Sequence, residues 1–111
     1  MIFSFMQINT NGVVSFDEPV RQFTPDSFPL ESSPIVAPFW ADVDTTRNDG
    51  RVHFRQSIDP TLLSRASTDV RTHAAGFDTF QATWLLIVTW DNVTYFGGDD
   101  TTGVSQYSNV V

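Results

Sequence analysis

The sequence predicts an α+β fold, a mainly antiparallel β-sheet with one packed α-helix over about residues 60–74. Short β-forming stretches alternate with turn signals along most of the chain, which is typical of antiparallel sheets. One segment alone combines a helix start signal with a helical apolar stripe. The length of 111 residues suits one domain, so we assign residues 1–111 to a single domain.

The chain opens with a predicted β-hairpin. Residues 2–8 and 13–16 are rich in β-forming side chains, and the sequence Asn-Thr-Asn-Gly lies between them. We expect Asn11 and Gly12 to supply the positive-φ positions of a tight hairpin turn. A polar loop with four prolines, residues 17–34, follows the hairpin.

Two apolar stretches, residues 35–43 and 80–90, predict buried strands. Each has a tryptophan near its end, and an aspartate follows that tryptophan within two residues. The second stretch is apolar on both faces and is therefore predicted to be central in the sheet. Residues 51–56 alternate and predict a half-exposed partner strand. We expect the indole side chains to lie mainly in the core: Trp40, Trp84 and Trp90.

The helix has a clear start. Asp59 is a favourable N-cap, and Pro60 suits the first helical position. Apolar residues recur on one side of the predicted helix, at positions Leu62, Leu63, Ala66 and Val70. We expect this stripe to pack across the sheet, because an amphipathic helix buries its apolar face.

The charge balance excludes several kinds of partner. The chain has thirteen acidic residues and six basic residues, all six of them arginine, and its net charge is −7. An acidic chain repels phosphate, so we expect no nucleic-acid partner.

No apolar run reaches the roughly 20 residues of a membrane span, so we expect no membrane insertion by this segment. Without cysteine, neither a disulfide framework nor a thiolate zinc site can form.

Three aspartates in one hairpin are calcium candidates: Asp42, Asp44 and Asp49. Clustered carboxylates can supply the oxygen ligands that calcium requires. The spacing departs from a helix–loop–helix calcium loop, because the sixth position from Asp42 is Arg47 and the twelfth is His53. Turn chemistry, in which Asp and Asn side chains bond nearby amides, explains the same residues. We therefore predict no metal site.

Asp42 and Asp91 raise a second alternative, that of a glycosidase with two carboxylates flanking a sugar bond. No nucleophile elbow, zinc spacing or phosphate loop accompanies them. We therefore expect no catalytic residue and no cofactor. Asn92, in Asn-Val-Thr, is a candidate for N-glycosylation.

Several segments together resemble a known family. They include Asn-Gly-Val-Val-Ser-Phe at 11–16, Ala-Pro-Phe-Trp-Ala-Asp-Val at 37–43 and Val-Thr-Trp-Asp-Asn-Val-Thr-Tyr-Phe at 88–96. In this order they resemble the nidogen-like (NIDO) extracellular domain, most closely that of the alpha-tectorin type. The family domain extends beyond both ends of this chain, so we expect the domain to be incomplete at both ends.

The resemblance implies a non-enzymatic module of a larger secreted or membrane-tethered protein that acts in extracellular matrix or cell–matrix adhesion. The implied partners are matrix proteins or other domains of the parent chain, and the implied location is extracellular, with no signal peptide in this segment. The rival class is a carbohydrate-binding module, either a calcium lectin or a glycosidase that uses the loop carboxylates. A third reading is a fragment without independent function.

Overall fold

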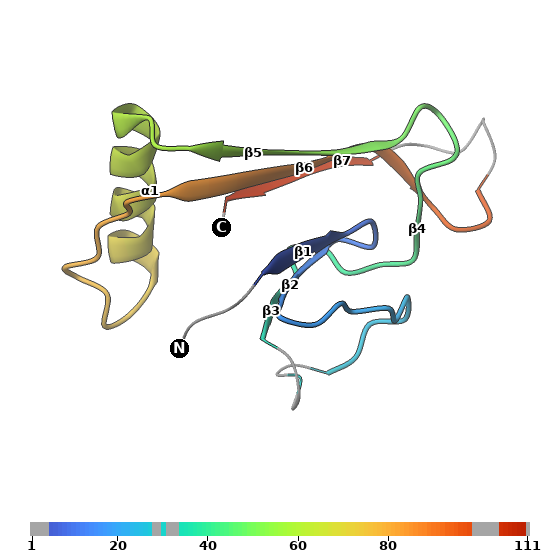
Figure 1. The fold of residues 1–111 in the computed structure, drawn as a ribbon, viewed down its shortest axis with the longest axis horizontal. Helices are drawn as coiled ribbons and strands as arrows, with labels where there is room; N and C mark the ends of the chain where they lie inside the picture. Colours follow the sequence, from blue (N-terminus) through green and yellow to red (C-terminus); the bar gives the residue numbers. More distant parts are fainter. Residues whose placement is uncertain (1–4, 28–29, 31–33, 99–104, 111) are drawn as a thin grey trace. The chain divides into compact units, whose positions relative to one another are not determined.

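The computed structural model describes residues 5–27, 30 and 34–98, together with the backbone of 105–110 (Figure 1). The chain divides into two compact units. The first comprises Met1–Val52 and Trp90–Tyr107, and the second comprises His53–Thr89 and Ser108–Val111.

The described residues confirm the predicted α+β class, with two antiparallel sheets and one helix. The first sheet has the order β1-β2-β3, and the second has the order β4-β6-β5, with β7 also paired to β6. The elements are β1 (Met6–Asn9), β2 (Val13–Phe16), β3 (Ile35–Val36), β4 (Val43–Asp44), β5 (Arg51–Ser57), α1 (Pro60–His73), β6 (Leu85–Tyr95) and β7 (Ser105–Val110).

The hairpin β1–β2 is confirmed, with Asn9 opposite Val13. Its turn differs from the prediction, because Gly12 has a positive φ of 83° and Asn11 does not. The Gly12 amide donates to the Asn9 carbonyl at 3.2 Å. The connection is thus a turn followed by one left-handed residue, and only that last position requires glycine.

The predicted strand over residues 35–43 is wrong as a single element. It is divided into β3, which pairs with β2, and β4, which pairs with β6. Pro38 lies between the two pieces and has no amide hydrogen to donate to a sheet. The chain therefore leaves one sheet and enters the other within this stretch, and of its two aspartates only Asp44 lies in a strand.

The strand predicted over residues 80–90 is displaced toward the C-terminus. β6 begins at Leu85 and continues to Tyr95 through a left-handed residue, Asn92, whose φ is 51°. Trp84 therefore precedes the strand, and its side chain is 40% exposed, so its placement in the core was wrong. Trp40 is half-buried, whereas Trp90 is fully buried, as predicted.

The buried apolar side chains lie mainly on two strands. In the first unit they are Val13 and Val14 of β2 and Trp90 and Val93 of β6; in the second they are Leu85, Leu86 and Val88 of β6. The Trp90 indole nitrogen donates to the Asn9 carbonyl at 3.1 Å, so the one polar atom of this buried ring is satisfied.

The helix α1 forms as the sequence predicts. The Leu62 amide donates to the Asp59 carboxylate at 3.0 Å, which confirms the N-cap, and Pro60 is the first helical residue. The predicted apolar stripe is only half-buried, and the buried residue of the helix is instead Ser67. In Figure 1, α1 joins the end of β5 to the loop that leads into β6.

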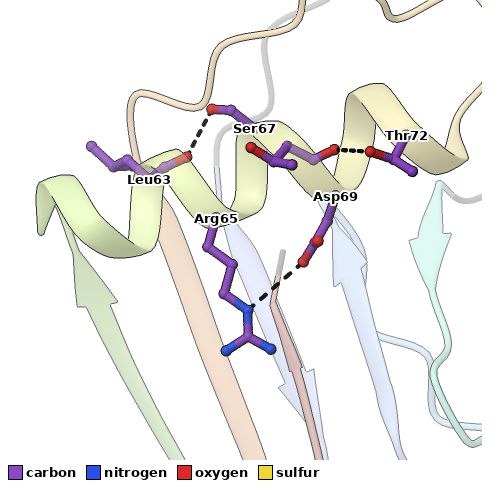
Figure 2. Close-up of polar contacts among 6 residues, drawn as sticks. Leu63, Arg65, Ser67, Asp69 and Thr72 are labelled. Carbon is purple, nitrogen blue, oxygen red and sulfur yellow. Dashed lines mark hydrogen bonds and ion pairs between the residues drawn. The ribbon is translucent and has the colours of Figure 1, made fainter.

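Ser67 fixes that loop to the helix. Its hydroxyl donates to the Leu63 carbonyl at 2.7 Å, as Figure 2 shows, and accepts a hydrogen bond from the Ala82 amide at 2.9 Å. The Arg71 guanidinium adds a second bond, to the Phe80 carbonyl at 3.3 Å. The helix is thus held by polar contacts with its own following loop, a role that apolar periodicity does not reveal.

Candidate functional site

The loops around the candidate acids come together in the first unit. We call residues 42–50 and 91–98 the rim. β4 pairs antiparallel with the end of β6, with Val43 opposite Tyr95 and Asp44 opposite Thr94. The Phe96 amide extends this pairing by donating to the Asp42 carbonyl at 2.9 Å. Residues 42–44 and 94–96, which are distant in sequence, are therefore neighbours.

Asn11 positions the first of these loops. Its carbonyl accepts from the Ala41 amide at 3.0 Å, and its side-chain oxygen accepts from the Val43 amide at 2.9 Å. Asn11 therefore acts as an anchor for the start of β4, in addition to its place in the hairpin turn. The Asn-Gly pair indicates the turn from sequence, but nothing local indicates this contact.

The turn at residues 45–50 is closely folded. Asp44 accepts from both the amide and the hydroxyl of Thr46, at 2.7 and 2.5 Å. The hydroxyl bond and then the amide bond hold the pKa of Asp44 below its ordinary value of 3.8. Desolvation opposes them, and the charge of Arg47 adds the smallest lowering effect. This is the turn chemistry that was one of the two explanations of the sequence.

Gly50 closes the turn against β6. A Cβ on this residue would lie 3.0 Å from the Thr45 Cα and 3.2 Å from the Asn92 carbonyl oxygen. The two preceding residues, Asn48 and Asp49, have positive φ values of 53° and 55°. A side chain at Gly50 would displace backbone on both sides, so glycine is required here by close approach.

The calcium candidates do not gather into a metal cage. Among the residues that the structure describes, no three His, Asp or Glu side chains lie close enough to hold an ion. Of the three candidates, Asp44 is engaged with Thr46, Asp49 is exposed and Asp42 is half-buried. Asp42 precedes β4 and Asp44 lies within it, and the absence of a metal site at the rim stays an untested prediction.

The two-carboxylate arrangement also receives no geometric support. The Asp42 carbonyl accepts a hydrogen bond from the Phe96 amide, and Phe96 lies five positions after Asp91 along the chain. Five strand residues extend about 15 Å. The carboxylates of glycosidases are about 5–9.5 Å apart. The fully buried Trp90 cannot serve as an open stacking surface for a sugar.

The rim lies in the unit that carries the net charge of the chain. The first unit contains ten acids and three arginines, and the second contains three acids and three arginines. The first unit is therefore charged −7 and the second is neutral. This division places the rim in the acidic unit of the chain.

The comparisons with known proteins agree with the family resemblance of the sequence. The nidogen-like domain family matches residues 4–110. Alpha-tectorin of Mus musculus is 47% identical over 105 residues, which are 94% of this chain and 5% of alpha-tectorin. Alpha-tectorin of Gallus gallus is 41% identical over the same length. Nidogen-1 of Mus musculus is 37% identical over 94 residues, which are 82% of this chain and 7% of nidogen-1. No solved structure matches.

The chain belongs to the nidogen-like domain family, as the sequence resemblance predicts. It spans a small fraction of its relatives, 5% of the alpha-tectorins and 7% of mouse nidogen-1. Within the described residues, no helix is long and apolar enough to cross a membrane.

Proposed function

We propose that this chain is a non-enzymatic module of the extracellular matrix that contacts its partners through the rim. The observation that carries the proposal is family membership: the chain is 47% identical to alpha-tectorin over 94% of its length and 37% identical to nidogen-1 over 82%. The nidogen-like domains of alpha-tectorins and nidogens are extracellular matrix modules. The implied partners are matrix proteins or other domains of a larger parent chain.

The choice of the rim rests on position and charge. Loops at the end of a sheet are held by a rigid frame while their side chains remain accessible. Here the frame is the β4–β6 pairing, and the loops lie in the unit with a net charge of −7. A partner with exposed arginine and lysine side chains fits this chemistry. The carbohydrate-binding and glycosidase alternatives find no support in the relatives or in the geometry.

The test compares two variants of the secreted chain with equal net charge. The rim variant carries Asp42→Asn, Asp49→Asn and Asp91→Asn, and leaves Asp44 in place because its carboxylate holds the turn. The control carries three changes in the second unit: Asp59→Asn, Asp69→Asn and Asp78→Asn. Asparagine is as good an N-cap as aspartate, so the control keeps its helix.

Binding to a decellularised matrix, laid down by cultured animal cells, is then measured for the parent and both variants. The rim variant is expected to bind about tenfold more weakly, since exposed ion pairs contribute about 0.5 kcal/mol each. The control should bind like the parent. Equal binding by all three proteins would remove the rim as the contact surface, and no binding by the parent would remove the proposed function.

A further inference from the structure

Asn92 lies in the only N-glycosylation sequence of this chain. Of the five asparagines, at positions 9, 11, 48, 92 and 109, only Asn92 is followed two positions later by serine or threonine. A three-residue pattern of this kind is common by chance. The pattern indicates a glycosylation site only if the folded chain exposes the asparagine to solvent, because a glycan is bulky and hydrophilic.

Strand alternation alone would bury this side chain. In a regular strand, residues 90, 92 and 94 share one face. Trp90 is fully buried and Thr94 is 4% exposed, so a regular β6 would turn Asn92 into the core between them. The structure shows the opposite, because Asn92 is exposed.

The cause is the left-handed backbone at Asn92, where φ is 51°. A left-handed residue inside a strand is the geometry of a β-bulge, and it changes which face the following residues occupy. Val93 and Thr94 are accordingly both buried, although they are adjacent. Asparagine is among the few residues that adopt this conformation readily. The left-handed residue therefore leaves Val93 and Thr94 buried while Asn92 itself is exposed.

The backbone at this point is also held in place. The Asn92 carbonyl lies 3.2 Å from the position a Cβ on Gly50 would occupy, so the turn at residues 45–50 packs directly on it. On the following side, Thr94 is fixed by its pairing with Asp44. The outward direction of Asn92 is thus a property of the folded first unit.

We propose that Asn92 carries an N-linked oligosaccharide, an inference that rests on the proposed extracellular function. The co-reactant is a lipid-linked oligosaccharide diphosphate. The Asn92 Nδ2 atom attacks the first sugar carbon, an N–C bond forms, and the bond from that carbon to the diphosphate oxygen breaks. The lipid diphosphate leaves, and one amide proton passes to solvent. The reaction precedes folding, so burial of the Thr94 hydroxyl in the final structure does not oppose it.

The experiment expresses the 111-residue chain behind a cleavable secretion signal in cultured animal cells. The mass of the secreted protein is measured before and after treatment with a peptide N-glycosidase, which converts a glycosylated asparagine to aspartate. Parent molecules should carry one glycan, located at residue 92. The glycan should be absent from Asn92→Gln and from Asn92→Gly. The glycine variant suits the positive φ and guards against misfolding of the glutamine variant.

An internal control comes from Arg65→Asn, which creates Asn-Ala-Ser on α1 at a position whose side chain is 81% exposed. This variant should carry two glycans, at residues 65 and 92. A glycan at residue 65 with none at residue 92 would overturn the proposal, and so would an unmodified Asn92 in the secreted parent. Matrix binding is a separate readout: a chain glycosylated at Asn92 that binds no matrix would contradict the proposed function alone.

Discussion

Asn11 shows how much one polar side chain contributes to the arrangement of the rim. It is half-buried, and through its side-chain oxygen it accepts the hydrogen bond of the Val43 amide at 2.9 Å. That amide belongs to the first residue of β4, the strand within the first rim segment, residues 42–50. Loss of the acceptor would leave a partly buried donor without a partner, which costs more than a hydrogen bond contributes on average.

Replacement of Asn11 by alanine should therefore lower the free energy of unfolding by about 1–2 kcal/mol. The measurement is a urea melt of the secreted chain. Asn11→Asp keeps an oxygen acceptor at the same place and should recover most of the loss. Equal destabilisation by alanine and aspartate would show that the Val43 bond is not the reason Asn11 matters.

Asp44 gives a pH-dependent test of the turn. Its pKa is lowered in the folded chain, mainly by the Thr46 hydroxyl, so its contribution to stability is present above pH 3.8 and is lost as the pH falls through the lower folded value. In an NMR titration the Asp44 carboxyl should titrate below 3.8. Thr46→Ala should raise this pKa toward 3.8, whereas Thr45→Ala should leave it in place. A pKa of Asp44 at or above the ordinary value would refute the contact.

At the scale of elements, the helix and its following loop form one structural piece. α1 buries Ser67 and leaves its apolar stripe half-buried, so the Ser67 bond to the Ala82 amide and the Arg71 bond to the Phe80 carbonyl hold the loop. Ring contact between Phe77 and Phe80, with centroids 6.5 Å apart at 73°, stiffens the same loop.

Removing the hydroxyl in Ser67→Ala should cost about 1–2 kcal/mol, because the Ala82 amide loses its acceptor. A matched control is Thr72→Ala. The exposed Thr72 hydroxyl also donates to the carbonyl four residues earlier, that of Thr68, at 2.7 Å (Figure 2). Thr72 holds no loop in this way, so its loss should change stability by less than about 0.5 kcal/mol. Amide hydrogen exchange at Ala82 should accelerate in the serine variant only; unchanged exchange there would contradict the role of Ser67.

Trp84, which directly precedes β6, and Trp90, which lies within it, should contribute unequally to the free energy of unfolding. Trp90 is fully buried and donates to the Asn9 carbonyl, whereas Trp84 is 40% exposed and donates to the Gln56 side chain at 3.0 Å. Trp90→Phe should lower the free energy of unfolding by about 2–3 kcal/mol, and Trp84→Phe by less than about 1 kcal/mol. Calorimetry of the two variants decides the matter, and equal costs would contradict the boundary of β6.

Local signals predicted the elements that depend on local interactions. Asp59 and Pro60 fix the start of α1 because an N-cap acts within one turn, and Gly12 marks the hairpin because its conformation excludes most other residues. The division of residues 35–43 between two sheets depends on distant strands, so no local pattern could indicate it. The exposure of Asn92 likewise depends on a bulge that alternation cannot register.

At the scale of the whole molecule, the uneven distribution of charge is the feature with the clearest functional consequence. The first unit holds the full net charge of −7 and the rim, whereas the second unit is neutral and exposes aromatic side chains, among them Phe54 and Phe77. The sequence offered Asp42, Asp44 and Asp49 as candidates in one segment and Asp91 in another. Their proximity became evident only from the pairing of β4 with β6, a contact between residues about fifty positions apart in the sequence.

The most direct test of the central claim is the salt dependence of matrix binding. If the acidic rim contacts a basic partner, the affinity of the secreted chain for decellularised matrix should fall steadily between low and high ionic strength, because exposed charges are screened. The rim variant should bind weakly throughout and respond little to salt. An affinity that is independent of ionic strength, or an equally steep salt response in the rim variant, would contradict the account.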